Sequence, residues 1–221
     1  MDIKTSAILV IDLQNEYRSE GAYPVSGYED ILAHAAAIIA AARHGTVPII
    51  YVQAWVEESE RSHYSLLNEA LTDDLRSAVA GSSGADICSE VSPERDETVV
   101  RKRWPSAFQD TDLHAHLNAL GIKEIVALGV WTDSCVRATV FDAIYKGYRV
   151  WLVKDACGSA TETMHRAGIL DMANRLYGGG VLRSEEAVKA LRGEPHRSWH
   201  CSRPIEFPYT LSSLNRFYCD L

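Results

Sequence analysis

The stretch GVWTDSCVR, residues 129–137, decides the fold that we expect for this chain. It follows a short apolar run at residues 125–128, which has the length of a buried strand. It precedes a run with helical character at residues 138–146. A strand that ends in a sharp turn and feeds a helix is the repeating unit of α/β proteins with parallel sheets. Cys135 therefore lies where the next helix begins.

This position makes Cys135 a candidate nucleophile. The first N–H groups of a helix carry partial positive charge and have no partner within the helix. A thiol beside them loses its proton more easily, and the same groups can hold an oxyanion. The alternative is that Cys135 is a small buried hydrophobic residue, as a cysteine after a strand usually is.

The composition indicates one globular domain. The chain has 221 residues, enough for a full core, and 47% of them are hydrophobic. The formal net charge of -8 argues against nucleic acid or an anionic membrane as a partner, because both favour basic surfaces. A local basic cluster does occur at residues 101–103.

Neither a signal peptide nor a membrane span is expected. The first apolar run is short and ends at Asp12, and no run approaches the roughly 20 apolar residues that a spanning helix needs. The five cysteines are odd in number and irregularly spaced, without a CxxC pair. We therefore expect a cytoplasmic protein with free thiols.

Alternating strands and helices predict the architecture. Apolar runs predict further strands at residues 7–11, 47–53, 149–153 and 181–182, and an extended segment at 97–102 would deliver Lys102. Helices are expected at residues 31–43, within 66–80, and at 111–120, 162–177 and 184–191. This order predicts a three-layer α/β/α, doubly wound fold with a mostly parallel sheet.

The chain divides into a domain over residues 1–192 and a tail over residues 193–221. The tail holds three prolines among several aromatic residues, which are costly to leave in water. We expect it to pack on its own domain or on a neighbouring subunit.

Three side chains with suitable chemistry follow predicted strands: Asp12, Lys102 and Cys135. The carboxyl ends of parallel strands meet at one edge of the sheet, where open α/β sheets build their sites. Asp12 can take the proton of a thiol and later give it to a leaving amine. A lysine beside both would stabilise their negative charge, although Lys102 in an Arg-Lys-Arg cluster is by default a solvated charge.

Taken together, these motifs resemble the isochorismatase-like cysteine hydrolases. The resemblance rests on Asp12 after its apolar strand, on KRWPSAF at residues 102–108 and on GVWTDSCVRAT at residues 129–139, and it covers roughly residues 5–190. The family includes N-carbamoylsarcosine amidase, biuret hydrolase and ureidoacrylate amidohydrolase. The resemblance implies a six-stranded sheet and a homo-oligomer, a dimer or a tetramer.

The resemblance also assigns roles to residues. It implies a catalytic triad of Asp12, Lys102 and Cys135, and an oxyanion hole made by the backbone N–H groups of Trp131 and Cys135. It implies a cis peptide bond between Val130 and Trp131. The reaction would be cleavage of the C–N bond of a small carboxamide or ureido compound, through a thioester, with release of ammonia.

Aromatic side chains near these motifs are candidate walls of a substrate pocket: Tyr17, Trp55, Trp104, Phe108 and Trp131. Flat rings suit a planar amide or urea. For Trp104 and Phe108, packing beneath the Lys102 loop is an equal alternative. Whether Arg103, Cys157 or His165 lines the pocket stays open.

The chain departs from the nicotinamidase branch of this family, which binds a metal through an Asp-x-His pair after the second strand. Residues 53–58 read QAWVEE here, and His63 stands alone nearby. We therefore expect no metal, no cofactor, and a substrate other than nicotinamide. The alternatives are hydrolysis of a vinyl ether or another non-amide bond, and a non-catalytic binding scaffold of the same fold.

Overall fold

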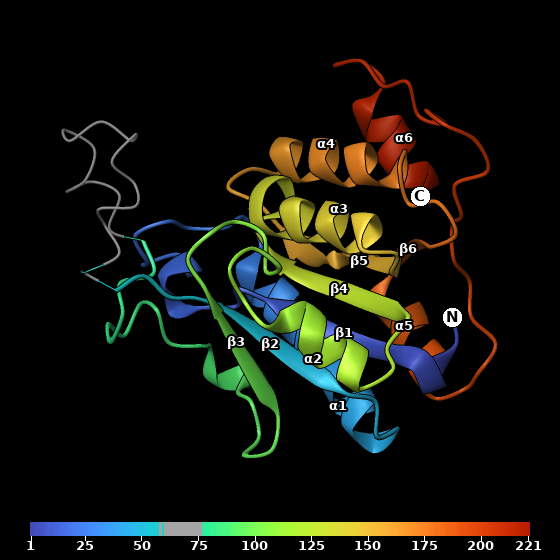
Figure 1. Cartoon of the computed structure of the whole chain (residues 1–221). Helices are drawn as coiled ribbons and strands as arrows, with labels where there is room; N and C mark the ends of the chain where they lie inside the picture. Colours follow the sequence, from blue (N-terminus) through green and yellow to red (C-terminus); the bar gives the residue numbers. More distant parts are fainter. Residues whose placement is uncertain (58, 60–76) are drawn as a thin grey trace.

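Six parallel strands form one sheet at the centre of the protein, which confirms the predicted fold class (Figure 1). The computed structural model describes residues 1–57, 59 and 77–221. The strand order is β3-β2-β1-β4-β5-β6, and every pairing is parallel. The strands are β1 (Ser6–Ile11), β2 (Ile49–Ala54), β3 (Thr98–Lys102), β4 (Glu124–Val130), β5 (Arg149–Gly158) and β6 (Gly180–Leu182).

Continuous apolar runs became the central strands. Every residue of β1 and β4 is buried, as the lack of a polar–apolar alternation predicts for strands covered on both faces. The segment that contains Lys102 is a strand of the sheet, β3, at its edge, where alternate residues are buried less.

Helices cover both faces and complete the three layers (Figure 1). On one face lie α1 (Tyr28–His44), which packs over the middle of the sheet, and α5 (Ser184–Leu191), which packs on α1 and β5. On the other lie α2 (Leu113–Ala119), α3 (Arg137–Tyr145) and α4 (Glu162–Ala173). None of the helices in the described ranges is long and apolar enough to cross a membrane.

The two middle strands, β1 and β4, mark the point where the chain changes direction across the sheet. The connection from β1 leaves through α1 on one face, and the connection from β4 leaves through α3 on the other. Such a switch point opens a crevice outside the carboxyl ends of the two strands, where α/β proteins bind ligands.

Several element boundaries differ from the predictions. Residues 155–158, expected as a loop, continue β5, and α4 ends at Ala173 rather than near residue 177. Of the helix expected within residues 66–80, residues 66–76 lie outside the described residues, and residues 77–80 are not helical. The helix α1 begins at Tyr28, three residues before its predicted start.

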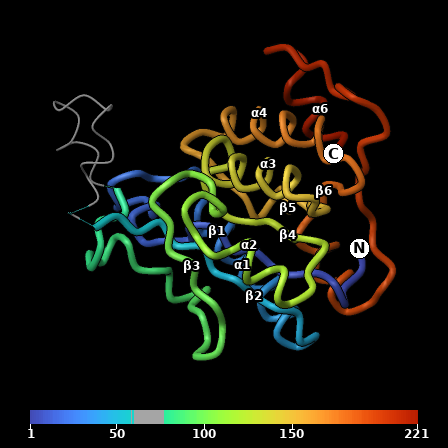
Figure 2. The backbone as a smooth tube through the Cα atoms, viewed as in Figure 1, coloured from blue at the N-terminus to red at the C-terminus, as the bar shows by residue number. Residues whose placement is uncertain are grey.

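The tail packs against its own domain. Trp199 exchanges two backbone hydrogen bonds with Val181 of β6, and the side chain of Asn174 pairs with the backbone of Phe207. The chain then forms a short helix that was not predicted, α6 (Leu214–Asp220), which lies beside α4 (Figure 2). Phe207 is thereby buried, and the other aromatic residues of the tail are partly buried against the core: Trp199, Tyr209, Phe217 and Tyr218.

Candidate active site

Asp12 occupies the first position after β1. Its backbone has a φ of 52°, and its N–H donates to the carbonyl oxygen of Val52 on the neighbouring strand. The carboxylate lies at the carboxyl edge of the two middle strands, where the exposed fraction of Asp12 is 0%. The structure therefore places the acid at the sheet edge that its position after a central strand predicts.

Lys102 ends β3, two strands away from Asp12. Its carbonyl oxygen accepts a hydrogen bond from the N–H of Trp55, which ties the ends of β2 and β3 together. The side chain is 3% exposed, so Lys102 is not the solvated charge that its Arg-Lys-Arg context alone would suggest.

Cys135 lies in one turn of π-helix, Thr132–Val136, that precedes α3. The turn starts from a cis peptide bond between Val130 and Trp131, the bond that the family resemblance implies. The carbonyl oxygen of Trp131 accepts hydrogen bonds from the N–H groups of Ser134 and Val136. Cys135 thus lies two residues before α3, inside this turn, rather than at the first residue of the helix.

Lys102 brings the three side chains together. Its Nζ atom lies 2.7 Å from Oδ2 of Asp12 and donates a hydrogen bond to Sγ of Cys135 at 3.3 Å. Side chains at or just beyond the ends of three different strands therefore meet at one point of the sheet edge. The arrangement can move a proton between the thiol and the carboxylate while the ammonium group balances their charge.

Gly129 allows β1 and β4 to approach closely at this point. Its φ is 124°, and a Cβ atom there would lie 2.0 Å from the carbonyl oxygen of Ile11. Ile11 pairs with Gly129 and directly precedes Asp12. A side chain at position 129 would therefore push the acid away from the turn that holds Cys135.

The electrostatics of the three groups follow from burial and mutual charge. Burial raises the pKa of Asp12, although Lys102 opposes the shift. Burial alone would lower the pKa of Lys102, but the negative charge of Asp12 helps to raise it above its ordinary value. Burial, followed by the charge of Asp12, raises the pKa of Cys135 to about 11. The resting thiol is therefore protonated, which corrects our expectation of an easily ionised thiol at a helix start.

Two of the predicted aromatic residues lie together beside the turn. The rings of Tyr17 and Trp131 meet edge to face with centroids 5.9 Å apart. Tyr17 is 4% exposed, while Trp131 is half-buried. Burial and then the charge of Asp12 raise the pKa of the Tyr17 hydroxyl well above its ordinary value, so it stays neutral.

The other predicted aromatic residues are engaged elsewhere. The Arg101 guanidinium lies 3.9 Å from the ring centroid of Trp55. Trp104 donates its indole N–H to Asp110. Phe108 stacks on Tyr148 with 7% of its surface exposed, so the packing alternative describes this residue.

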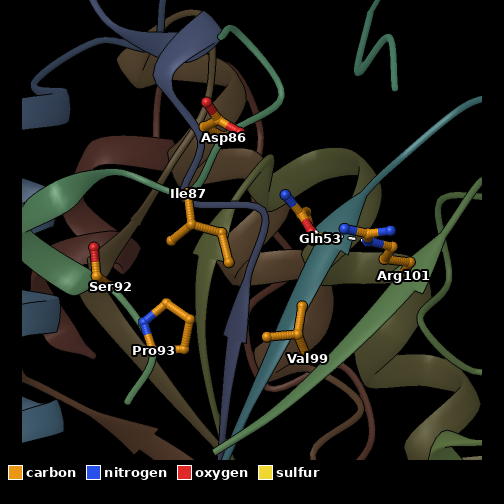
Figure 3. A pocket seen from close by; sticks show the side chains of 7 residues that line it. All are labelled: Gln53, Asp86, Ile87, Ser92, Pro93, Val99 and Arg101. Carbon is orange, nitrogen blue, oxygen red and sulfur yellow. Dashed lines mark hydrogen bonds between the residues drawn. The ribbon is translucent and has the colours of Figure 1, made fainter. Parts of the chain in front are cut away.

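Gln53 and Arg101 line a separate open groove (Figure 3). Arg101 and Lys102 are neighbours in β3, so their side chains point to opposite faces of the sheet. Nε of Arg101 donates to Oε1 of Gln53, and Nε2 of Gln53 donates to the carbonyl oxygen of Ala85.

Among the residues whose role stayed open, Arg103 pairs with Asp110, and Cys157 is buried beside Gly129.

Two polar side chains that follow Asp12 and hold neighbouring segments to it were missed. Gln14 bonds to the backbone of Ala54 through both its oxygen and its nitrogen. Glu16 is buried and accepts hydrogen bonds from the N–H of Ala78 and the hydroxyl of Ser77. The sequence contains no signal for these roles, because their partners lie some 40 to 60 positions away and most of them are backbone groups.

His165, whose role also stayed open, lies on α4 and forms a hydrogen bond with the turn. Its Nδ1 atom lies 2.8 Å from the hydroxyl of Thr132, and its Nε2 atom lies 2.9 Å from the hydroxyl of Tyr218 in the tail. Burial lowers the pKa of His165 to about 4, so its ring is neutral.

Within the described ranges, no group of three or more His, Cys, Asp or Glu side chains could hold a metal ion. His63 lies outside the described residues.

Comparison with known proteins matches the chain to one family over most of its length. The model of the isochorismatase domain matches residues 6–186. A probable inactive nicotinamidase of Arabidopsis thaliana is 34% identical over 182 residues, 77% of this chain and 89% of that protein. Ureidoacrylate amidohydrolase RutB of Methylobacterium radiotolerans is 30% identical over 221 residues, 90% of this chain and 83% of that protein.

The fold has a solved counterpart. The crystal structure of an isochorismatase-like hydrolase from Alkaliphilus metalliredigens superposes with a TM-score of 0.72 at 30% identity. The match covers 84% of this chain and 98% of that one.

Proposed function

Because the chain belongs to the isochorismatase family of hydrolases, we propose that it is a cysteine-dependent amidohydrolase. Its substrate would be a small planar carboxamide or ureido compound. The observation that carries the proposal is the position of Lys102 Nζ, 2.7 Å from the carboxylate of Asp12 and 3.3 Å from the sulfur of Cys135. Related amidohydrolases, RutB and the maleamate amidohydrolase of Pseudomonas putida, support amide cleavage.

In the first half of the proposed reaction, Asp12 takes the proton of the Cys135 thiol as its sulfur attacks the carbonyl carbon. General-base removal suits this site, since the pKa of about 11 keeps the resting thiol protonated. The backbone N–H groups of Trp131 and Cys135 would bind the oxyanion. Asp12 then gives its proton to the departing nitrogen, so ammonia leaves and a thioester remains.

In the second half, Asp12 removes a proton from water, and the hydroxide attacks the thioester carbonyl. The tetrahedral intermediate collapses, the thiol regains the proton, and the carboxylic acid leaves. Lys102 stays charged throughout and balances whichever of Asp12 and Cys135 is anionic. The ring of Trp131, held edge-on by Tyr17, would form a wall against a planar acyl group.

The test is ammonia release from a panel of primary amides, ureas and ureido acids. Cys135→Ala should abolish turnover, whereas Cys157→Ala, at the same edge of the sheet, should retain it. Mass spectrometry of Cys135→Ser with a substrate should detect an ester on residue 135. Hydrolysis of a vinyl ether but of no amide would replace the proposal with the alternative chemistry. Undiminished turnover by Cys135→Ala would exclude the covalent route.

We also propose that the protein is a cytoplasmic homo-oligomer. The five cysteines are all free, which suits a reducing compartment. Sedimentation of the purified protein would test the oligomeric state.

A further inference from the structure

Three hydrogen bonds form a continuous chain that includes side chains of the turn, α4 and the tail. The hydroxyl of Thr132 donates to the carbonyl oxygen of Gly158 at 2.9 Å. Nδ1 of His165 lies 2.8 Å from the same hydroxyl, and Nε2 of His165 lies 2.9 Å from the hydroxyl of Tyr218. The chain starts one residue after Trp131, in the turn that carries the proposed oxyanion hole.

The chemistry of the partners determines the direction of each hydrogen bond. A carbonyl oxygen only accepts, so the single proton of the Thr132 hydroxyl points to Gly158. His165 must then carry its proton on Nδ1 and donate it to Thr132. In a neutral imidazole the other nitrogen accepts, and so the hydroxyl of Tyr218 donates to Nε2. The Tyr218 donor therefore favours the Nδ1–H tautomer, which leaves the proton of Thr132 for Gly158. Without that donor, Nε2 could carry the proton of the ring, and Thr132 would donate to Nδ1 instead of to Gly158.

The contact between α4 and the turn is close enough to transmit a displacement. Thr132 is completely buried, and a Cβ atom on Gly168 of α4 would lie 3.0 Å from its methyl group. At the start of the turn, the carbonyl oxygen of Trp131 already accepts two hydrogen bonds from backbone N–H groups. A change at Thr132 has little free space in which to be absorbed before it reaches Trp131.

Tyr218 is itself held by more than its hydroxyl. The Nζ atom of Lys154 donates to its carbonyl oxygen at 3.0 Å and lies 4.7 Å from its ring centroid. The Arg166 guanidinium lies 5.2 Å from the same ring. Lys154 belongs to β5 and Arg166 to α4, so α6 contacts both elements through this one residue.

We propose that Tyr218 is a positioning residue of the active site, which holds the oxyanion-hole turn in its productive geometry through His165 and Thr132. The inference rests on the proposed function, since it assigns the turn a role in stabilising an oxyanion. It extends the active site to the tail, beyond the region that matches the family domain, residues 6–186.

The test compares Tyr218→Phe with Tyr209→Phe. Tyr209 is a second half-buried tail tyrosine, and its hydroxyl makes no hydrogen bond to the residues that the structure describes. Tyr218→Phe keeps the ring but removes the donor. We expect kcat on an amide to fall by about three- to tenfold, with KM within about twofold of the wild-type value. Tyr209→Phe should match the wild type in both.

Alkylation of Cys135 by iodoacetamide separates positioning of the turn from damage to the thiol. The thiol displaces iodide from iodoacetamide without forming an oxyanion. Tyr218→Phe should therefore be alkylated at the wild-type rate while its amide turnover falls. A parallel loss in both reactions would mean that the substitution disturbs Cys135 itself, and would overturn the inference, as would an unchanged kcat.

Nuclear magnetic resonance provides a readout that needs no substrate. The ring nitrogens of His165 should show the Nδ1–H tautomer in the wild type and a mixture in Tyr218→Phe, with a shift of the Trp131 amide resonance. If the wild type hydrolyses no amide, the proposed function fails, and the resonances alone then test whether Tyr218 is coupled to the turn. An unmoved Trp131 amide would then overturn the inference, and a shifted one would support it.

Discussion

The Nζ atom of Lys102 lies 2.7 Å from Oδ2 of Asp12, and both side chains are almost completely buried. A buried ion pair is a weak source of net stability, because the cost of removing both charges from water offsets their attraction. Losing one partner is different, since it leaves the other charge buried and uncompensated. The pair therefore makes the candidate site a place where single substitutions affect folding and chemistry together.

Lys102→Met should destabilise the protein by about 3–5 kcal/mol, because it leaves the Asp12 carboxyl group buried without its cation. Urea unfolding measures this change in the free energy of unfolding. Lys123→Met is the matched control, since Lys123 is exposed. Equal stability of the two variants would contradict the energetic role of the buried pair.

Asp12→Asn should have opposite effects on two reactions of the same thiol. The negative charge of Asp12 helps to raise the pKa of Cys135 to about 11. Removing that charge lowers the thiol pKa, so alkylation of Cys135 by iodoacetamide at pH 8 should accelerate. Amide hydrolysis should nevertheless be lost, because an asparagine cannot accept the proton. Peptide mapping after timed alkylation measures the first effect, and ammonia release measures the second.

In the wild-type protein, the alkylation rate of Cys135 should rise by about tenfold per pH unit between pH 7 and pH 10. The reactive thiolate is a small fraction of the total over this range, since the pKa of Cys135 is about 11. A plateau below pH 8 would show that the thiol is ionised at rest, and that Asp12 is not needed as a base.

Gly129→Ala should destabilise the protein more than Gly147→Ala. Both residues have a positive φ, 124° and 88°, so each substitution costs backbone strain of about 1–2 kcal/mol. Only at Gly129 would the new Cβ atom also meet another backbone, 2.0 Å from the carbonyl oxygen of Ile11. Thermal and urea unfolding of both variants should show the larger loss at position 129, together with reduced amide hydrolysis. A similar loss in the two variants would argue against the close approach.

Stability should fall as the pH decreases from about 6.5 to about 4, in part because of His165. Burial lowers the folded-state pKa of His165 from 6.5 to about 4, so the unfolded chain binds a proton that the folded protein does not. The contribution, about 3 kcal/mol, is fully present above pH 6.5 and has been lost once the pH has fallen through 4. His165→Gln should flatten this part of the urea-unfolding profile, and His44→Gln, at an exposed position, should leave it unchanged.

The central strands and the fold class could be predicted because the relevant signal is local. The run before Asp12 and the run before Gly129 are apolar without alternation, and such runs are stable only between two covering layers. The helix α6 escaped prediction because it has only seven residues, too few to be stable without the tertiary contacts of Leu214 and Phe217. The tail was expected to be packed, but its sequence contains no sign of the surface it packs on.

The candidate site was predictable in part. Asp12 and Cys135 follow central strands, and the carboxyl ends of parallel strands must share one edge of the sheet. Phe108 and Trp131 carried the same signal, an aromatic ring near a motif. One stacks on Tyr148 in the core and the other faces Tyr17 beside the turn. Their difference depends on which neighbours reach each ring, and those neighbours come from other parts of the chain.

The sequence alone determined the parallel α/β architecture and which three side chains stand at the ends of strands, because strand burial and turn geometry depend on neighbours along the chain. Only the tertiary structure decided that the Cys135 thiol is protonated at rest, since its pKa depends on burial and on the charge of Asp12, 123 positions away. It also decided that Tyr218 contacts His165 behind the turn. A hydrogen bond of that kind depends on how α4 and α6 pack together, and the pattern of residues along the chain does not predict it.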